Sequence, residues 1–171
     1  MENEKFKFKK LDGTPISDVE KYVKNWLKEK SVDYPYSTVT IGCDSQVHGR
    51  RVKYATVICM HFVDKMHVGH GAHVIIADLW EKRQGLSQVD EMPAKLWKEA
   101  EFVLAVAQMV DGNDEVFKKR ITVHLDLNVE ENSGSNMMYA AGVGMLRGMG
   151  YITEGKPFAW AATHTADAFC R

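Results

Sequence analysis

Two aspartates, each following a segment of alternating apolar and polar residues, predict a shared carboxylate site. Asp44 ends the segment 37–44, and Asp126 lies near the end of 120–127. Each aspartate has the parity opposite to the apolar row of its segment, so both side chains should emerge on the same side of a sheet. Two carboxylates at close range repel each other unless a cation lies between them. Oxygen ligands without thiolates favour Mg²⁺ or Mn²⁺, so the pair predicts a divalent-metal site.

Two further acids are candidates for the same site. Helical spacing over 91–110 places Glu99 at the border of the apolar stripe and Glu101 on the opposite side, so Glu99 is favoured while Glu101 stays open. Asp167 follows the last expected strand and is a weaker candidate. Each acid also has a structural alternative, because a strand aspartate can cap a turn and a border glutamate can reach solvent.

The elements that must position these acids follow from the order of periodic segments. Ser17 and Glu20 resemble a capping box, which predicts a helix over about 17–30. Further helices are expected at 91–110, 135–148 and around residue 167, and strands at 37–44, 51–63, 67–80, 120–127 and 158–162. Three antiparallel strands followed by crossovers predict an α/β fold with a five-stranded mixed sheet flanked by helices. We expect one domain over 37–171, preceded by an extension, 1–36, with one short helix.

Composition limits the class of protein. The 171 residues carry 22 Lys and Arg against 23 Asp and Glu, a net charge of −1, which argues against a broad electrostatic footprint for nucleic acid. Local basic patches, among them Arg50, Arg51 and Lys53, are interpreted first as solvated strand ends and turns. Three scattered cysteines without a C-x-x-C pair predict neither a disulfide framework nor a zinc knuckle. Without a signal-type or membrane-spanning apolar run, we expect a cytoplasmic protein.

Four short motifs resemble the ribonuclease H-like superfamily and, within it, most closely the YkuK-like family. They are I-G-C-D-S-Q at 41–46, V-H-L-D-L-N at 123–128, S-N at 135–136 and K-P-F-A-W-A-A-T-H-T-A-D at 156–167. Their order and spacing carry the resemblance, which covers roughly 37–167. It implies a ribonuclease H-like fold whose second strand is antiparallel to the others. It also implies a metal-binding catalytic set of Asp44, Glu99, Asp126 and Asp167.

The activity that this resemblance implies is hydrolysis of phosphodiester bonds in RNA or DNA at two Mg²⁺ or Mn²⁺ ions about 4 Å apart. His164 could assist proton transfer in such a site, although a histidine without a catalytic role is equally compatible. Substrate contacts are expected from Gln46 and from Asn128, Ser135 and Asn136, where a helix start could hold a phosphate or simply be capped.

The sequence also departs from the hydrolytic ribonucleases H. It lacks their basic handle region, and its slightly acidic total charge puts a strict RNA–DNA hybrid substrate in doubt. The alternative to a nuclease is therefore a non-catalytic ribonuclease H-like domain that binds nucleic acid or a protein partner, since fold alone does not settle activity.

Overall fold

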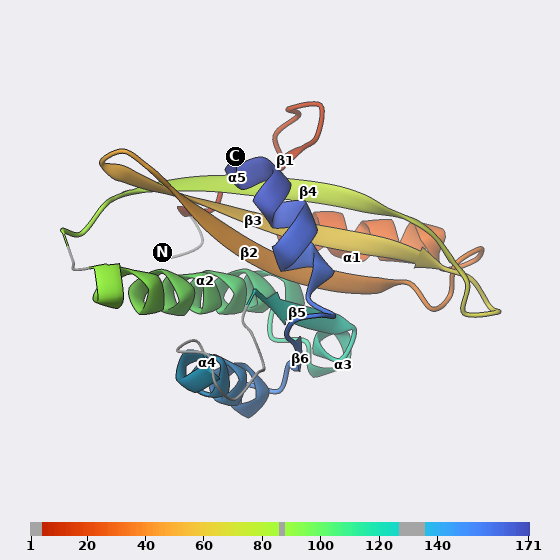
Figure 1. Cartoon of the computed structure of the whole chain (residues 1–171). Coiled ribbons are helices and arrows are strands. Elements are labelled where there is room, and N and C mark those ends of the chain that lie inside the picture. The colour runs from red at the N-terminus through yellow and green to blue at the C-terminus, as the bar shows by residue number, and fades with distance from the viewer. Residues whose placement is uncertain (1–4, 86–87, 127–135) are drawn as a thin grey trace.

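A six-stranded mixed sheet organises the chain, with the strand order β1–β4–β3–β2–β5–β6 (Figure 1). The structure is a computed structural model that describes residues 5–85, 88–126 and 136–171. The strands are β1 (Lys9–Lys10), β2 (Thr38–His48), β3 (Arg51–Val63), β4 (Gly69–Lys82), β5 (Ile121–Leu125) and β6 (Ile152–Glu154). β2, β3 and β4 form an antiparallel meander, while β5 and β6 add to it in parallel.

Helices cover both faces of the sheet (Figure 1). They are α1 (Val19–Lys30), α2 (Gln88–Asp111), α3 (Glu115–Lys118), α4 (Asn136–Gly148), the π-helical turn η2 (Ala161–Ala166) and α5 (Asp167–Cys170). The long helix α2 packs under β2 and β5, whereas η2 and α5 cross β2 and β3 on the opposite face. None of the helices in the described ranges is long and apolar enough to cross a membrane.

The expected mixed α/β architecture is confirmed, with one strand more than predicted. The added strand is β1, whose two residues pair antiparallel with Ile75 and Ile76 of β4. From the same N-terminal part of the chain, Phe8, Val23 and Leu27 are buried in the main core. A two-residue strand is too short to show an alternating pattern, so no period-2 signal could predict it.

Two local predictions were wrong. The expected strand at 158–162 is largely helical, because η2 begins at Ala161, and the sixth strand lies earlier, at Ile152–Glu154. A short apolar run is compatible with either a buried strand or a buried helix, so its period could not decide. Helix α1 is capped by Asp18, not Ser17: an Asp18 side-chain oxygen accepts the backbone N–H of Lys21 at 2.9 Å.

The alternation in β2 divides its side chains between two cores. Val39, Ile41 and Cys43 are fully buried in the main core beneath α2. Gly42 lies on the other face, where an added Cβ would come within 2.6 Å of the backbone nitrogen of Ala162. The terminal helical segment therefore rests directly on the backbone of β2, which brings residues from the end of the chain to the level of Asp44.

Candidate carboxylate site

β2 and β5 are parallel neighbours, as the sequence predicted, and their register aligns the two aspartates. Gly42 pairs with His124 and Cys43 pairs with Leu125, so Asp44 and Asp126 follow at the same level, one residue beyond the last pair. Asp44 was expected at the end of its strand, but β2 continues to His48 and, among the described residues, pairs beyond Asp44 with β3. The site therefore lies where β5 ends and a longer β2–β3 hairpin extends past it.

Asp44 lies among other acids. Its pKa is raised from 3.8 to about 6, first because the carboxyl group is partly buried and then because Asp126 and Asp167 repel its negative charge. The backbone N–H of Ser45 and the ammonium of Lys95 act in the opposite direction. Acids at the end of β5 and at the start of α5 therefore lie within electrostatic reach of Asp44.

Glu99 approaches the same region from α2. Its side chain is 5 % exposed and accepts a hydrogen bond from the hydroxyl of Ser45. Burial raises its pKa to about 8, with further repulsion from Asp44 and Asp126. Glu101 instead accepts a hydrogen bond from the Trp97 indole at 2.9 Å and pairs with Lys98 at 3.3 Å. Glu99, rather than Glu101, therefore lies within electrostatic reach of Asp44 and Asp126, as the helix phase predicted.

A buried histidine of β5 holds the start of the helical segment that leads to Asp167. The His124 ring is buried, and its Nδ1 accepts the backbone N–H of Ala161 at 3.1 Å, at the start of η2. A neutral His124 then carries its proton on Nε2, which lies 3.1 Å from Glu154 Oε2. Burial lowers the His124 pKa, which favours this neutral form. The imidazole therefore anchors the segment that leads to Asp167.

Two cations accompany the acids, and the sequence reasoning missed both contacts. Lys156 Nζ lies 2.7 Å from Asp126 Oδ1, and an Arg171 guanidinium nitrogen lies 2.6 Å from Asp167 Oδ2. Lys156 belongs to the K-P-F-A-W motif, where a basic residue just before the terminal helix was the available signal. Each pair partly compensates an acid that still contributes to the repulsion at Asp44.

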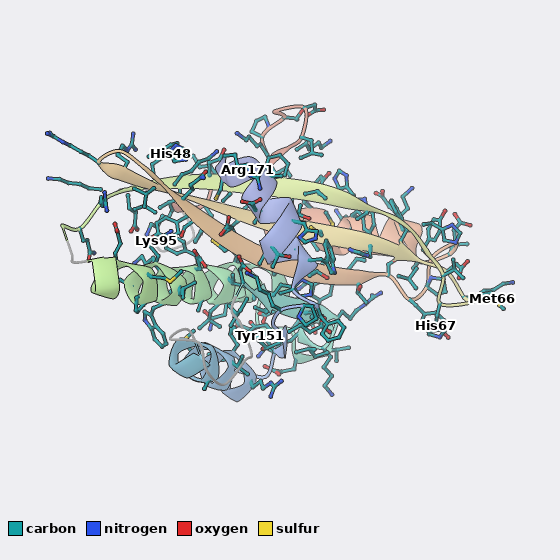
Figure 2. All side chains as sticks on the ribbon, in the orientation of Figure 1. His48, Met66, His67, Lys95, Tyr151 and Arg171 are labelled. Atoms are coloured by element: carbon teal, nitrogen blue, oxygen red, sulfur yellow. The ribbon has the colours of Figure 1, made fainter. Side chains whose placement is uncertain are left out.

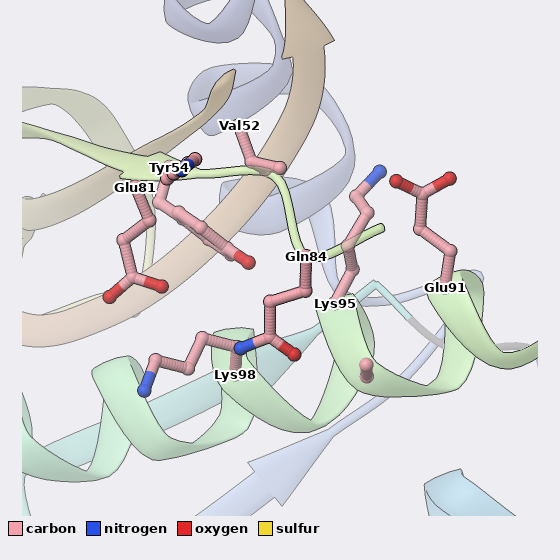
Figure 3. Close-up of a pocket in the computed structure, with 9 residues that line it drawn as sticks. Val52, Tyr54, Glu81, Gln84, Glu91, Lys95 and Lys98 are labelled. Atoms are coloured by element: carbon pink, nitrogen blue, oxygen red, sulfur yellow. The ribbon is translucent and has the colours of Figure 1, made fainter. Parts of the chain in front are cut away.

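A pocket opens on the α2 face of the sheet, opposite the face that carries Asp44, and none of the four acids is among its lining residues (Figure 3). It lies between the start of β3, the end of β4 and the first half of α2. Tyr54, Glu91, Lys95 and Lys98 are among its lining residues. Lys95 links the pocket to the acids, because its ammonium lowers the pKa of both Asp44 and Glu99. Figure 2 shows Lys95 on the α2 side of the sheet and Arg171 on the α5 side.

The donor set fits a hard divalent cation by its chemistry. Asp44, Glu99, Asp126 and Asp167 offer carboxylate oxygens, the ligands that Mg²⁺ and Mn²⁺ prefer. Asp126 Oδ1 is buried, has no hydrogen-bond partner among the described residues and lies 2.7 Å from the Lys156 ammonium. Within the described ranges, however, no group of three or more His, Cys, Asp or Glu side chains is placed to hold a metal ion.

Of the other predicted site residues, two are exposed in the described part of the chain. Gln46 is exposed on β2, two residues beyond Asp44 and therefore on the same face. His164 is exposed in η2, where its Nδ1 lies 2.9 Å from the Thr163 hydroxyl. Asn128 and Ser135 lie outside the described residues. Asn136 begins α4, but its side chain is also outside the described part of the chain.

Comparison with known proteins gives one family. A family model described as Ribonuclease H-like matches residues 17–171, which is most of the chain. No curated protein and no solved structure matches. The YkuK-like resemblance remains a finer prediction within that family. The match agrees with the mixed sheet, in which β3 is antiparallel to its neighbours β2 and β4, and with the helices on both faces; the chain belongs to the ribonuclease H-like family.

Proposed function

We propose that this chain is a metal-dependent nuclease that hydrolyses phosphodiester bonds in RNA or DNA. The observation that carries the proposal is the parallel register of β2 and β5, which brings Asp44 and Asp126 to the same level next to the helix that begins with Asp167; burial and repulsion from these acids raise the pKa of Asp44. Acids that only cap turns have no reason to gather from β2, the end of β5 and α5. A structure that keeps such repulsion suits a site meant for an added cation.

In this proposal Asp44, Glu99, Asp126 and Asp167 hold one or two Mg²⁺ or Mn²⁺ ions. The cations would activate water and stabilise the leaving oxygen of the phosphodiester. Other residues of the chain would orient these acids and compensate their charge. The Ser45 hydroxyl orients Glu99, His124 anchors the segment before Asp167, and Lys156 and Arg171 compensate the acids when no cation is bound.

Outside the four acids, we assign supporting roles to polar residues around the end of β5. His164 is exposed three residues before Asp167 and would move protons to or from the reacting oxygens. Gln46 would contact substrate from β2. Asn128, Ser135 and Asn136 would contact a phosphate near the start of α4. The free cysteines Cys43, Cys59 and Cys170 favour a reducing, cytoplasmic setting.

A second candidate function is a non-catalytic domain that binds nucleic acid or a protein partner. The observation that favours it is the pairing of Asp126 with Lys156 and of Asp167 with Arg171. With these ion pairs in place, two of the four acids already have a positively charged partner from the chain itself. A protein that never binds a metal ion would need such internal counter-charges, so metal binding separates the two functions.

The test is Mn²⁺-stimulated cleavage across single-stranded, duplex and hybrid substrates, with Asp44→Asn as the decisive variant. Removal of a partner that only orients a metal ligand costs about 10- to 100-fold, so loss of a ligand should reduce cleavage about 100-fold or more. The matched control is Glu101→Gln, which removes an acid from the same helix as Glu99 but outside the cluster. It should cleave like the unaltered protein.

Calorimetric titration with Mn²⁺ provides a readout that does not depend on turnover. Binding should weaken in Asp44→Asn and persist in Glu101→Gln. Cleavage that survives undiminished in Asp44→Asn would refute the nuclease proposal at this site. Absence of both Mn²⁺ binding and cleavage in the unaltered chain would favour the non-catalytic domain.

A further inference from the structure

Trp80 lies in a cationic cluster on β3, β4 and the end of β2. The Arg51 guanidinium carbon lies 4.9 Å from the centre of an indole ring, Lys53 Nζ lies 5.9 Å from it, and the His48 ring centre is 5.3 Å away. The Trp80 residue is nevertheless 41 % exposed. We call His48, Arg51, Lys53 and Trp80 the Trp80 cluster.

The strand register places this cluster on the face that carries Asp44. Asp44 pairs with Ala55, which pairs with Asp78. Two residues further along β2, the next row on the same face consists of Gln46, Lys53 and Trp80. With rows about 6.8 Å apart and strands about 4.8 Å apart, Trp80 lies on the order of 12 Å from Asp44.

The cluster is locally basic although the chain is nearly neutral. Lys53 pairs with Asp78 at 3.6 Å, but no acid in the described part of the chain forms an ion pair with Arg50 or Arg51. These two arginines are exposed at the turn of the β2–β3 hairpin and at the start of β3. The surface beside Trp80 therefore presents positive charge without a partner from the described residues.

The terminal helix connects the cluster to the carboxylate site. The Lys53 ammonium donates to the Phe169 carbonyl oxygen, and His48 Nε2 lies 2.9 Å from the Cys170 carbonyl oxygen. Both contacts hold α5, the helix that begins with Asp167. Beyond α5, the β2–β3 hairpin continues past the point where the helix crosses the sheet, and Figure 2 labels His48 on this extension (Figures 1 and 2).

We propose that the Trp80 cluster is a subsite for single-stranded polynucleotide, with one unpaired base stacked on Trp80 and the adjacent phosphates attracted by Arg50 and Arg51. Exposed aromatic rings beside a basic groove are the usual platform for single strands, because every base offers a face for stacking. In a duplex the faces of the bases are already stacked on their neighbours. The proposal deepens the proposed nuclease function by naming its substrate class, and it rests on that function.

The test is fluorescence anisotropy of labelled 12-residue oligo-dT and oligo-U, measured with the full chain in EDTA so that nothing is cleaved. Loss of one stacked base should weaken binding about tenfold in Trp80→Ala, whereas Trp80→Phe should retain most of it. The matched control is Tyr36→Ala. Tyr36 is also exposed and is stacked on a histidine, His67, at 4.1 Å, but it lies at the opposite end of β2 and β3.

Arg51→Gln tests the electrostatic part of the subsite. Loss of one phosphate contact should reduce the slope of log affinity against log salt by about one, and Lys65→Gln in the opposite hairpin should leave the slope unchanged. Circular dichroism verifies that each variant is folded. Equal affinity of Trp80→Ala and Tyr36→Ala would overturn the subsite. Competition by poly-Glu or by phosphatidylserine vesicles as strong as that by unlabelled oligonucleotide would overturn its polynucleotide specificity.

The binding assay keeps this inference separate from the nuclease proposal. A chain that binds single strands through Trp80 but never cleaves them would refute the nuclease function and leave the subsite intact. A chain that cleaves, with Trp80→Ala binding like the unaltered protein, would refute the subsite and leave the nuclease function intact.

Discussion

The two faces of the sheet are covered in different ways. On the α2 face, large side chains such as Ile58, Leu27 and Phe8 fill a thick core beneath α1 and α2. On the opposite face, η2 and α5 rest on the sheet through small residues, including Ala161, Ala166 and Cys170. The thick face suits a role in stability, whereas the thin face brings the end of the chain close to the strand backbone.

The acids of the candidate site also come from both faces of the sheet. Glu99 comes from the thick face, where it is buried and bonded to Ser45. Asp167 comes from the thin face, close enough to raise the pKa of Asp44. At the boundary between the two layers, a buried carboxylate from one face lies near more accessible carboxylates from the other, and separate changes in each layer can test this division.

The largest effect is expected from truncation in the thick layer. Ile58→Ala removes a fully buried side chain of the main core, which should lower the free energy of unfolding by about 3–4 kcal/mol. Val57→Ala, its neighbour on the thin face, should cost about 2 kcal/mol because fewer buried methyl groups are lost. Urea unfolding measures both. An equal or larger loss for Val57→Ala would show that the thin face contributes as much stability as the thick one.

A somewhat smaller effect is expected where the thin layer touches the strand. Gly42→Ala would place a Cβ 2.6 Å from the backbone nitrogen of Ala162 and 2.7 Å from the Ala161 carbonyl carbon. Because backbone atoms cannot step aside as a flexible side chain can, we expect a loss of about 2–3 kcal/mol and a displaced terminal helix.

The control for this change is Gly144→Ala in α4, where an added Cβ meets nothing within 4 Å. Alanine should stabilise that helix by about 0.5–1 kcal/mol. If Gly42→Ala were as harmless as Gly144→Ala in thermal unfolding, the terminal segment would not be closely seated on β2. Mn²⁺ binding by Gly42→Ala would then also be expected to match that of the unaltered chain.

The sequence could predict what depends on local periodicity. Alternation in two segments identified β2 and β5 and placed Asp44 and Asp126 on one side, and helix phase separated Glu99 from Glu101. These features need only the rule that strands repeat every two residues and helices every 3.6. The acids were therefore recognisable before any contact was known.

Features that depend on how distant segments meet were missed. Arg51 and Lys53 were interpreted as a solvated basic patch. Their local sequence does not indicate that Trp80, almost thirty positions later on β4, lies opposite Lys53 of β3. The contact of Lys156 with Asp126 depends on the path of the loop before η2. β6 has only three residues, too few to establish a period, so the more apolar run that follows it was mistaken for the strand.

The smallest expected effect is on the pH dependence of the free energy of unfolding, which can separate the contribution of Glu99 from those of the other acids. Its pKa is about 8 in the folded protein against 4.5 for an ordinary glutamate. Between these values the folded state keeps a proton that the unfolded state has lost, so the contribution is fully present below pH 4.5 and is lost as pH rises through about 8. Asp44, with a pKa of about 6, titrates earlier in the same direction. Above pH 6.5 the remaining slope should therefore come mainly from Glu99.

Glu99→Gln retains an oxygen that can accept the Ser45 hydroxyl hydrogen bond but cannot ionise. In EDTA, the unaltered chain should lose about 1–2 kcal/mol of unfolding free energy between pH 6.5 and 8.5, whereas Glu99→Gln should lose much less, because each pH unit in the window is worth at most about 1.4 kcal/mol. Urea unfolding at several pH values measures the difference, with Glu101→Gln as the control that should keep the full slope. Identical slopes in all three proteins would mean that Glu99 is already ionised in the folded state, and that it meets the aspartates as a charged ligand even before a cation arrives.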